Sequence, residues 1–217
     1  MTLTAAAGAE AIRGLHASPP APLPFAPSLH VRAFVLERPA GNVLLYSAPG
    51  VGAGTFAAAG PIARAYLNHR HEAAFGHDLP GVPLFVHSAD RDAVARHRHV
   101  RAAFSHRHLL DDDLEVIPTP GHTPGATAFL WDSGEHRFLF TGDTLYLRDG
   151  AWAAAVLDSS DRAAYVRSLE LLRELDFDVL VPWAAGAGDR WFAVTSNAEA
   201  RRRIDAVIER VRGGADS

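Results

Sequence analysis

Three short segments of the sequence place histidine or aspartate where those side chains could bind a metal ion. His69 and His71 follow a short apolar run, and in an extended segment residues i and i+2 point to the same side. His122 lies within TPGHTPG, a loop stiffened by proline and glycine, and Asp143 ends the apolar run FLFTGD. The carboxylate there could ligate a metal or hold its water. Each segment alone is unspecific, but the three in this order, each at an expected strand end, indicate a metal site.

The composition limits the chemistry to imidazole and carboxylate. The chain has 217 residues, 48% of them hydrophobic and 21% charged, which is typical of one soluble globular domain. It has no cysteine, which excludes disulfides, thiolate metal sites and iron–sulfur clusters. All 21 basic residues are arginine, so lysine chemistry is excluded as well. The 12 histidines are therefore the main supply of metal ligands.

The charge pattern argues against nucleic-acid and membrane partners. The formal net charge of −4 gives no general attraction to nucleic acid or to membrane surfaces. The Arg- and His-rich stretch 96–108 is interpreted as a solvated segment because the whole chain is acidic. We see no secretory signal and no apolar run long enough to span a membrane. We therefore expect a cytoplasmic protein with a small-molecule partner; its oligomeric state stays open.

The order of elements predicts a layered α/β domain. Residues 1–28 are expected to form a helix over Ala5–Leu15 and a proline-rich linker, followed by a single domain over 29–217. That domain should begin with a hairpin around Gly41-Asn42. Strands are expected over 65–68, 83–87, 114–117, 126–131, 137–141 and 179–181, and helices over 55–65, 89–96, 161–175 and 199–211. Sheets covered by helices, as in an αββα sandwich, fit this order.

Four motifs resemble the metallo-β-lactamase fold superfamily, particularly its glyoxalase II-like branch. They are HRHEAA at 69–74, PGHTPG at 120–125, FTGDTLY at 140–146 and VPWAAG at 181–186. The resemblance covers about residues 29–186. It implies a four-layer αββα sandwich with the active site at one edge of the β-sandwich. It also implies that His69, His71 and His122 hold one metal ion and that Asp143 corresponds to the carboxylate that bridges two ions.

The same resemblance indicates that a second metal site is missing. The family's ligands for the second ion correspond to Ala73, Ala74 and either Ala184 or Ala185 in this chain. Alanine cannot coordinate a metal ion, so we expect one ion at most. Three imidazoles with an open fourth position are typical of catalytic zinc, with iron or manganese as alternatives.

Three acidic or imidazole side chains near the missing ligands could replace them. Glu72 could take over as the catalytic base, although its neighbouring position gives it a different direction. His77 and Asp78 lie about one helical turn further on and could supply a displaced ligand. The simpler interpretation of His77 and Asp78 is a pair at a helix end.

Two functions remain in competition. The first is a single-zinc hydrolase of a small ester, thioester or lactone, in which metal-bound hydroxide attacks and Asp143 ligates the ion or positions its water. The alternative is a catalytically degenerate member of the family with a binding or structural role. The alternative rests on the lost ligands and on Ser47–Gly50, where the family often has an Asp-Thr-Gly turn. Nucleic-acid processing is disfavoured by the acidic charge balance.

Overall fold

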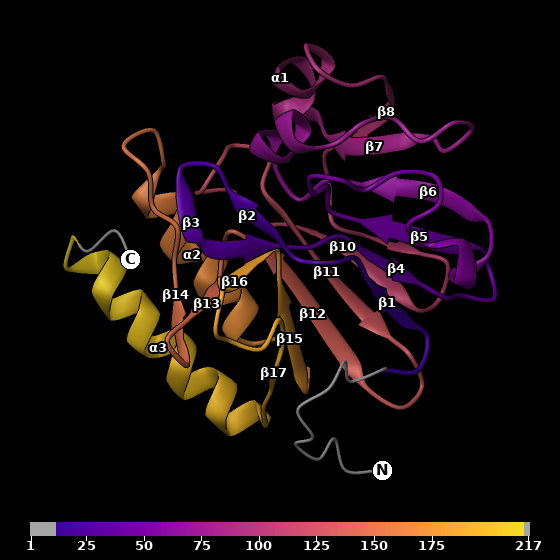
Figure 1. Ribbon diagram of the computed structural model, residues 1–217. Coiled ribbons are helices and arrows are strands. Elements are labelled where there is room, and N and C mark those ends of the chain that lie inside the picture. Colours follow the sequence, from indigo (N-terminus) through magenta and orange to yellow (C-terminus); the bar gives the residue numbers. More distant parts are fainter. Residues whose placement is uncertain (1–11, 215–217) are drawn as a thin grey trace.

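Two six-stranded sheets make up most of the computed structural model, in which residues 12–214 are described (Figure 1). The first sheet contains, in spatial order, β1 (Leu15–Ala17), β4 (Phe34–Leu36), β5 (Asn42–Leu45), β6 (Ile62–Tyr66), β7 (Leu84–His87) and β8 (Val100–Phe104). Its first three strands pair antiparallel, and β5 to β8 pair parallel. The β4–β5 pair is the hairpin predicted around Gly41-Asn42.

The second sheet comes from the later part of the chain, and a smaller third sheet flanks it. The second sheet contains β17 (Ala193–Val194), β15 (Val179–Pro182), β12 (Arg137–Gly142), β11 (Thr127–Asp132), β10 (Leu114–Pro118) and β9 (His108–Leu110). Only β12 and β15 pair parallel among these neighbours. The third sheet contains β14 (Ala151–Ala153), β13 (Tyr146–Arg148), β16 (Ala184–Gly186), β3 (Ala26–Val31) and β2 (Ala21–Leu23).

Two longer helices cover one side of the molecule, and short helical segments follow several strands of the first sheet. The helices are α1 (Arg91–Ala95), α2 (Arg162–Arg173) and α3 (Asn197–Arg212), and the 3-10 segments are η1 (Ala57–Ala59), η2 (Arg70–Phe75) and η3 (Ser88–Asp90). Asp161 caps α2 by accepting the Ala164 N–H, and Ser196 caps α3 by accepting the Glu199 N–H. Figure 1 shows α2 and α3 side by side, away from the first sheet.

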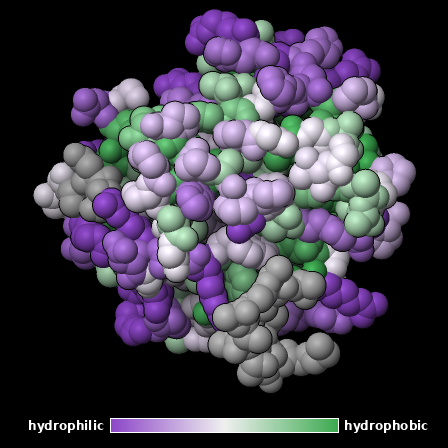
Figure 2. Space-filling model, viewed as in Figure 1, coloured by the Kyte–Doolittle hydropathy of each residue, from purple (hydrophilic) through white to green (hydrophobic). Residues whose placement is uncertain are grey.

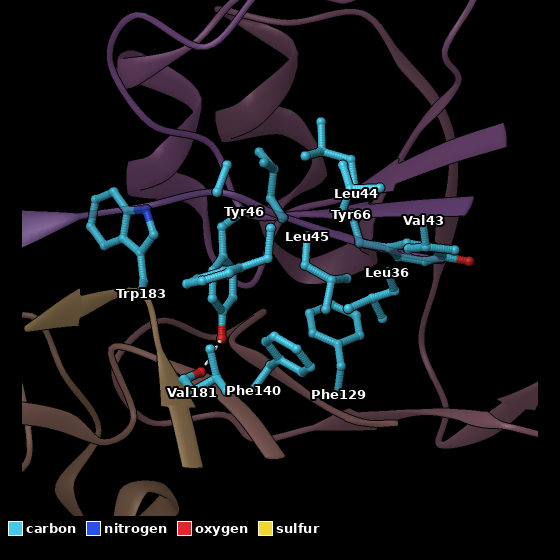
Figure 3. Close-up of a cluster of buried hydrophobic side chains, with 14 of the residues drawn as sticks. Leu36, Val43, Leu44, Leu45, Tyr46, Tyr66, Phe129, Phe140, Val181 and Trp183 are labelled. Atoms are coloured by element: carbon cyan, nitrogen blue, oxygen red, sulfur yellow. Dashed lines mark hydrogen bonds between the residues drawn. The ribbon is translucent and has the colours of Figure 1, made fainter. Parts of the chain in front are cut away.

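Aromatic side chains fill the space between the two large sheets. Phe34 of β4 contacts Phe140 of β12, and Tyr66 of β6 contacts Phe129 of β11. The buried Tyr46 hydroxyl donates to the Val181 carbonyl at 3.1 Å and accepts the Gly142 N–H at 2.8 Å (Figure 3). Removing one such buried ring typically costs about 3–5 kcal/mol, so this core holds the sheets together.

Alternation along β12 creates a second core under the helices. Phe138 and Phe140 belong to the cluster between the sheets, whereas Leu139 belongs to a cluster with Leu169 of α2 and Ile204 of α3. Successive side chains of a strand point to opposite faces, which explains the division. The result is the layered αββα sandwich predicted from the sequence, with only the five-residue α1 and short 3-10 segments on the side of the first sheet.

The N-terminal region corrects one prediction. Residues 15–28 do not form a linker, because β1 pairs with β4 and β3 runs across the predicted boundary at residue 28. Most of the helix predicted over Ala5–Leu15 lies outside the described residues, and Leu15 itself begins β1. Pro22 lies in β2, an edge strand, where the missing N–H is tolerated.

A second correction concerns residues 55–65, predicted as a helix. Only Ala57–Ala59 is helical, and β6 begins after Gly60-Pro61, since proline cannot continue the helix. Strands β13, β14, β16 and β17 are too short to be predicted. The face seen in Figure 2 is largely hydrophilic, also around α1, with smaller apolar areas between the polar ones. None of the helices within residues 12–214 is both long and apolar enough to cross a membrane.

Candidate metal centre

The four residues predicted as metal ligands come together from four chain segments. His69 follows β6, His71 lies in η2, His122 lies in the β10–β11 loop, and Asp143 follows β12. One ring nitrogen from each histidine lies within 4.8 Å of the others. His71 Nδ1 is 3.1 Å from His122 Nε2. The Asp143 Oδ2 atom lies 3.4 Å from His69 Nε2 and 3.5 Å from His122 Nε2.

The two histidines of the HRH motif converge for a different reason from the one predicted. His69 has extended backbone, but residues 70–75 form the 3-10 helix η2, so His71 is not on the same strand face. The chain turns at the end of the strand, and His71 is carried back toward His69, with ring centroids 5.2 Å apart. The motif therefore works as a strand end followed by a helical turn.

Hydrogen bonds on the far side of two rings fix which nitrogen faces the cluster. The Asn68 side-chain NH2 donates to the carbonyls of Thr127 and Thr141, which leaves its Oδ1 as an acceptor for His69 Nδ1 at 2.8 Å. His69 Nδ1 therefore carries the proton, and Nε2 has the free lone pair. His122 Nδ1 is fixed likewise by the Ala155 carbonyl at 2.6 Å.

The donor set fits a metal ion. His69 Nε2 is buried and has no hydrogen-bond partner among the described residues. A buried polar atom without a partner costs about 1–3 kcal/mol, and a cation between the three rings would satisfy it. Burial also lowers the pKa of His69 to about 3 and that of His71 to about 4, and it lowers the pKa of His122. All three rings are neutral at pH 7, the form that binds metal.

Asp143 is the acidic member of the cluster. Burial raises the pKa of its carboxyl group to about 6, while the neighbouring His69 ring acts in the opposite direction. Its Oδ2 atom is the one that approaches His69 and His122. This is a position from which a carboxylate can ligate the ion or accept a hydrogen bond from a water molecule at the centre.

Glu72 is not brought to the open side of this cluster. Its fully buried carboxylate accepts three backbone N–H bonds, from Ser47 at 2.8 Å, Asn68 at 2.8 Å and His69 at 3.1 Å. Burial raises the pKa of Glu72 to about 8, and the three N–H donors oppose that shift. Glu72 does not line the cavity, so its geometry is that of a group that holds the His69 backbone from behind. No contact supports the predicted base role.

His77 and Asp78 supply no ligand in this structure. The Asp78 carboxylate accepts from Arg98 Nε at 2.7 Å and from the His99 N–H at 2.9 Å, while His77 is exposed. The same contacts correct the interpretation of stretch 96–108, because Arg98 is buried and ion-paired although most of its neighbours are solvated.

Two residues that the sequence did not point to, Asn68 and Asp90, support the centre. Asp90 is buried and accepts the Arg70 N–H at 2.9 Å, the Thr123 hydroxyl at 2.7 Å and the Gly125 N–H at 3.2 Å. It thereby ties η2 to the loop that carries His122. A Cβ atom at Gly125 would lie 2.6 Å from Asp90 Cγ, which explains the glycine that ends TPGHTPG.

The cluster opens into a cavity of about 570 Å³. Most of its lining is apolar, and its polar lining includes His71, His122 and Asp143. Ala74, at a position where we expected a lost ligand, and Ala184, one of the two candidates for another such position, also line this cavity. Within residues 12–214, His69, His71 and His122 form the one group of three or more potential ligands close enough to share an ion.

Fold and site together define a layered α+β protein with a cluster of three histidines that could hold a metal ion. The family model for the metallo-β-lactamase superfamily matches residues 51–184, more than half of the chain. The chain therefore belongs to the metallo-β-lactamase superfamily. No curated protein matches the sequence.

Solved structures agree on the fold at low sequence identity. A metallo-β-lactamase from Pontibacter korlensis is 14% identical with a TM-score of 0.67, covering 94% of this chain and 97% of that one. An archaeal superfamily protein from Sulfolobus tokodaii is 17% identical with a TM-score of 0.61, covering 90% and 86%. A dizinc quorum-quenching lactonase, AidC, is 13% identical with a TM-score of 0.56, covering 77% and 76%. These similarities concern the fold alone.

Proposed function

We propose that this protein is a metal-dependent hydrolase of a small ester, thioester or lactone, with one zinc ion as its cofactor. The observation that carries the proposal is the buried Nε2 atom of His69, which has no hydrogen-bond partner among the described residues and lies close to two further neutral imidazoles. Iron or manganese would suit the same donors. The glyoxalase II-like motifs favour ester-type substrates over other bonds that the superfamily cleaves.

The roles of the residues follow from their positions. His69, His71 and His122 would hold the ion, and a bound ion supplies Lewis acidity toward a carbonyl group and makes water more acidic. Asp143 Oδ2, beside two of these rings, would ligate the ion or orient the attacking water by accepting a hydrogen bond from it. Asn68 and Glu72 hold His69 from behind and act as positioning residues.

The surroundings support a small-molecule substrate. The cavity of about 570 Å³ has the size of ordinary ligand pockets, which measure about 300–1,000 Å³. Net charge and composition give no support for a nucleic-acid substrate, and we propose that the protein acts in the cytoplasm.

The test is the metal content of the protein purified without a histidine tag. Zinc, iron and manganese per chain would be measured by plasma mass spectrometry for the wild type, for His122→Ala and for His106→Ala, an exposed-histidine control. We expect about one zinc per chain in the wild type and in the control, and almost none in His122→Ala. Equal metal content in His122→Ala and the wild type would refute the site.

A specific observation keeps the alternative of a catalytically inactive binding protein in view. Ala74 and Ala184 give the cavity methyl groups where the family resemblance implied ligands, which removes charge that could stabilise a transition state. Turnover of thioester and lactone panels by the zinc-loaded protein separates the two functions. Hydrolysis that disappears in His69→Ala supports the hydrolase, whereas metal binding without turnover of any panel member supports the binding protein.

A further inference from the structure

Arg70, the middle residue of the HRH motif, brings a positive charge to the cavity without a counter-ion. Its side chain lines the cavity and is partly buried. Asp90 bonds to the Arg70 backbone N–H, and the guanidinium has no hydrogen bond or ion pair with any residue of the described range 12–214.

The two buried arginines of the described residues, Arg38 and Arg98, are both paired with carboxylates. Arg98 binds Asp78, and Arg38 binds Asp111 and Asp113. A sheltered guanidinium usually has such a partner, because losing water without gaining an acceptor is unfavourable. Arg96, on the rim of the same cavity, is a second guanidinium with no partner among the described residues. Two unpaired guanidinium groups beside one cavity point to an anion that comes from outside the chain.

A row of aromatic side chains connects the solvent-exposed Phe25 to the His69 ring of the candidate metal centre. Phe25 contacts Phe75 with centroids 6.4 Å apart, Phe75 contacts Trp183 at 5.8 Å, and Trp183 contacts His69 at 5.3 Å. Phe25 is 77% exposed, and Leu157, which also lines the cavity, is 43% exposed. Large apolar side chains left open to water beside a cavity indicate an apolar ligand.

We propose that the cavity selects substrates that combine an anionic group with an apolar body. Arg70, assisted by Arg96, would bind the anion, and the rings of Phe25, Phe75 and Trp183 would hold the apolar body beside the centre. A carboxylate and a phosphate share the chemistry that a guanidinium recognises. That the bound molecule is a substrate rests on the proposed function. Binding of the anion and of the apolar body can be measured without any turnover.

The test uses metal-free protein, so that no probe can bind through an ion. After chelation, calorimetry would compare 4-phenylbutyrate with its uncharged amide, 4-phenylbutanamide, and with 3-phenylpropylphosphonate. We expect the wild type to bind the better anion at least about tenfold more tightly than the amide, the order expected of a good charge-assisted contact. The stronger of the two anions identifies the group that the site prefers.

Variants assign the preference to the proposed residues. Arg70→Gln should remove most of the anion preference and leave amide binding within about twofold, whereas Phe75→Ala should weaken all three probes together. Arg96→Gln should reduce the preference by a smaller factor, about threefold, because its side chain is exposed. Arg101→Gln is the matched control, since Arg101 is exposed and does not line the cavity.

Several outcomes would overturn the proposal. They are equal binding of anion and amide by the wild type, an anion preference kept in Arg70→Gln, and a preference seen only after zinc is restored. Thermal unfolding of each variant shows that it is folded, and Arg96→Gln provides an independent reading if Arg70→Gln does not fold. If the protein binds no zinc or shows no turnover but keeps the anion preference, the proposed hydrolase function is refuted and the proposed anion site still stands.

Discussion

The two sides of the cavity are built on opposite principles. On the imidazole side, His69 and His122 are fixed by hydrogen bonds behind the ring, and Asp143 lies against both. On the other side, Ala74 and Ala184 offer only methyl groups, next to aromatic side chains. The first side is organised to hold a cation, and the second provides apolar surface. This difference supports the proposal of one ion and an apolar ligand part in the cavity.

The buried polar residues that support the cavity wall also lie mainly on the imidazole side. Asn68, Glu72 and Asp90 are fully or almost fully buried, and each one satisfies several backbone or side-chain groups around the imidazoles. Such outer hydrogen bonds fix the tautomer and the direction of metal ligands. The apolar side relies on ring contacts, which tolerate small shifts. Four experiments measure how strongly the two sides differ.

The largest effect is expected from removing a ligand. His69→Ala should weaken zinc binding at least about a thousandfold, or about 4 kcal/mol, since one of three imidazole ligands is lost. Ala184→Ser, on the apolar side of the cavity, should change zinc affinity by less than about threefold. Competition with a chromogenic chelator measures both. Comparable losses in the two variants would show that the two sides of the cavity do not differ as described.

The next effect is one of stability. Glu72→Ala leaves three backbone N–H groups without their buried acceptor, so we expect the free energy of unfolding to fall by about 3 kcal/mol. Glu72→Gln keeps one carbonyl acceptor and should lose about half as much. Denaturant unfolding gives these values. If Glu72→Gln kept full stability and zinc but lost all turnover, Glu72 would be a catalytic base after all.

A smaller effect on the metal is expected from Asn68, which contacts one ligand ring, that of His69, on the side away from the cluster. Asn68→Ala frees His69 to rotate or to change tautomer, and zinc affinity should fall about 10- to 100-fold. Cobalt substitution would reveal the altered geometry as a changed visible spectrum. Asn197→Ala, at the start of α3 and outside the cavity, serves as the control. An unchanged spectrum and affinity in Asn68→Ala would assign Asn68 to the fold alone.

The smallest effect is a count of protons. At pH 5.5 three ordinary imidazoles with a pKa of about 6.5 would release about 2.7 protons when zinc binds. Burial holds the pKa of His69 at about 3 and that of His71 at about 4, so these rings are already neutral there. Asp143, with a pKa near 6, does carry a proton.

The Asp143→Asn variant removes this carboxyl proton, so that only the rings are counted. Zinc binding to this variant at pH 5.5 should therefore release fewer than half of the 2.7 protons expected for ordinary rings. Calorimetry in two buffers of different ionisation enthalpy counts the protons. A release of more than two protons by Asp143→Asn would mean that the rings are ordinary surface imidazoles.

The ligand candidates could be predicted from the sequence because each ends a strand or lies in a stiff loop. His69, His122 and Asp143 are adjacent to apolar runs whose burial in sheets was evident, and their motifs resemble those of a known superfamily. Asn68 gave no such signal, since its amide bonds reach carbonyls 59 and 73 residues away. Contacts of that range become visible only when the two sheets are placed together.

The N-terminal strands show where local rules fail. The prolines of residues 19–27 suggested a linker, yet β2 and β3 form there, because proline is acceptable at a sheet edge and at a strand start. Phe25, which lies between these strands, reaches the cavity for the same reason. Residues of the predicted linker thus line part of the cavity.

The position of the three imidazoles has a consequence for assembly of the chain. His69 and His71 belong to the part of the chain that builds the first sheet, and His122 belongs to the part that builds the second. An ion held by all three would link the two parts, and it would bind tightly only after the two sheets have packed against each other. At about a thousandfold excess over its dissociation constant it would add about 4 kcal/mol to the closed state. Metal occupancy would then report whether the chain is fully folded, since a chain with only one part folded would offer the ion no more than two of the three histidines.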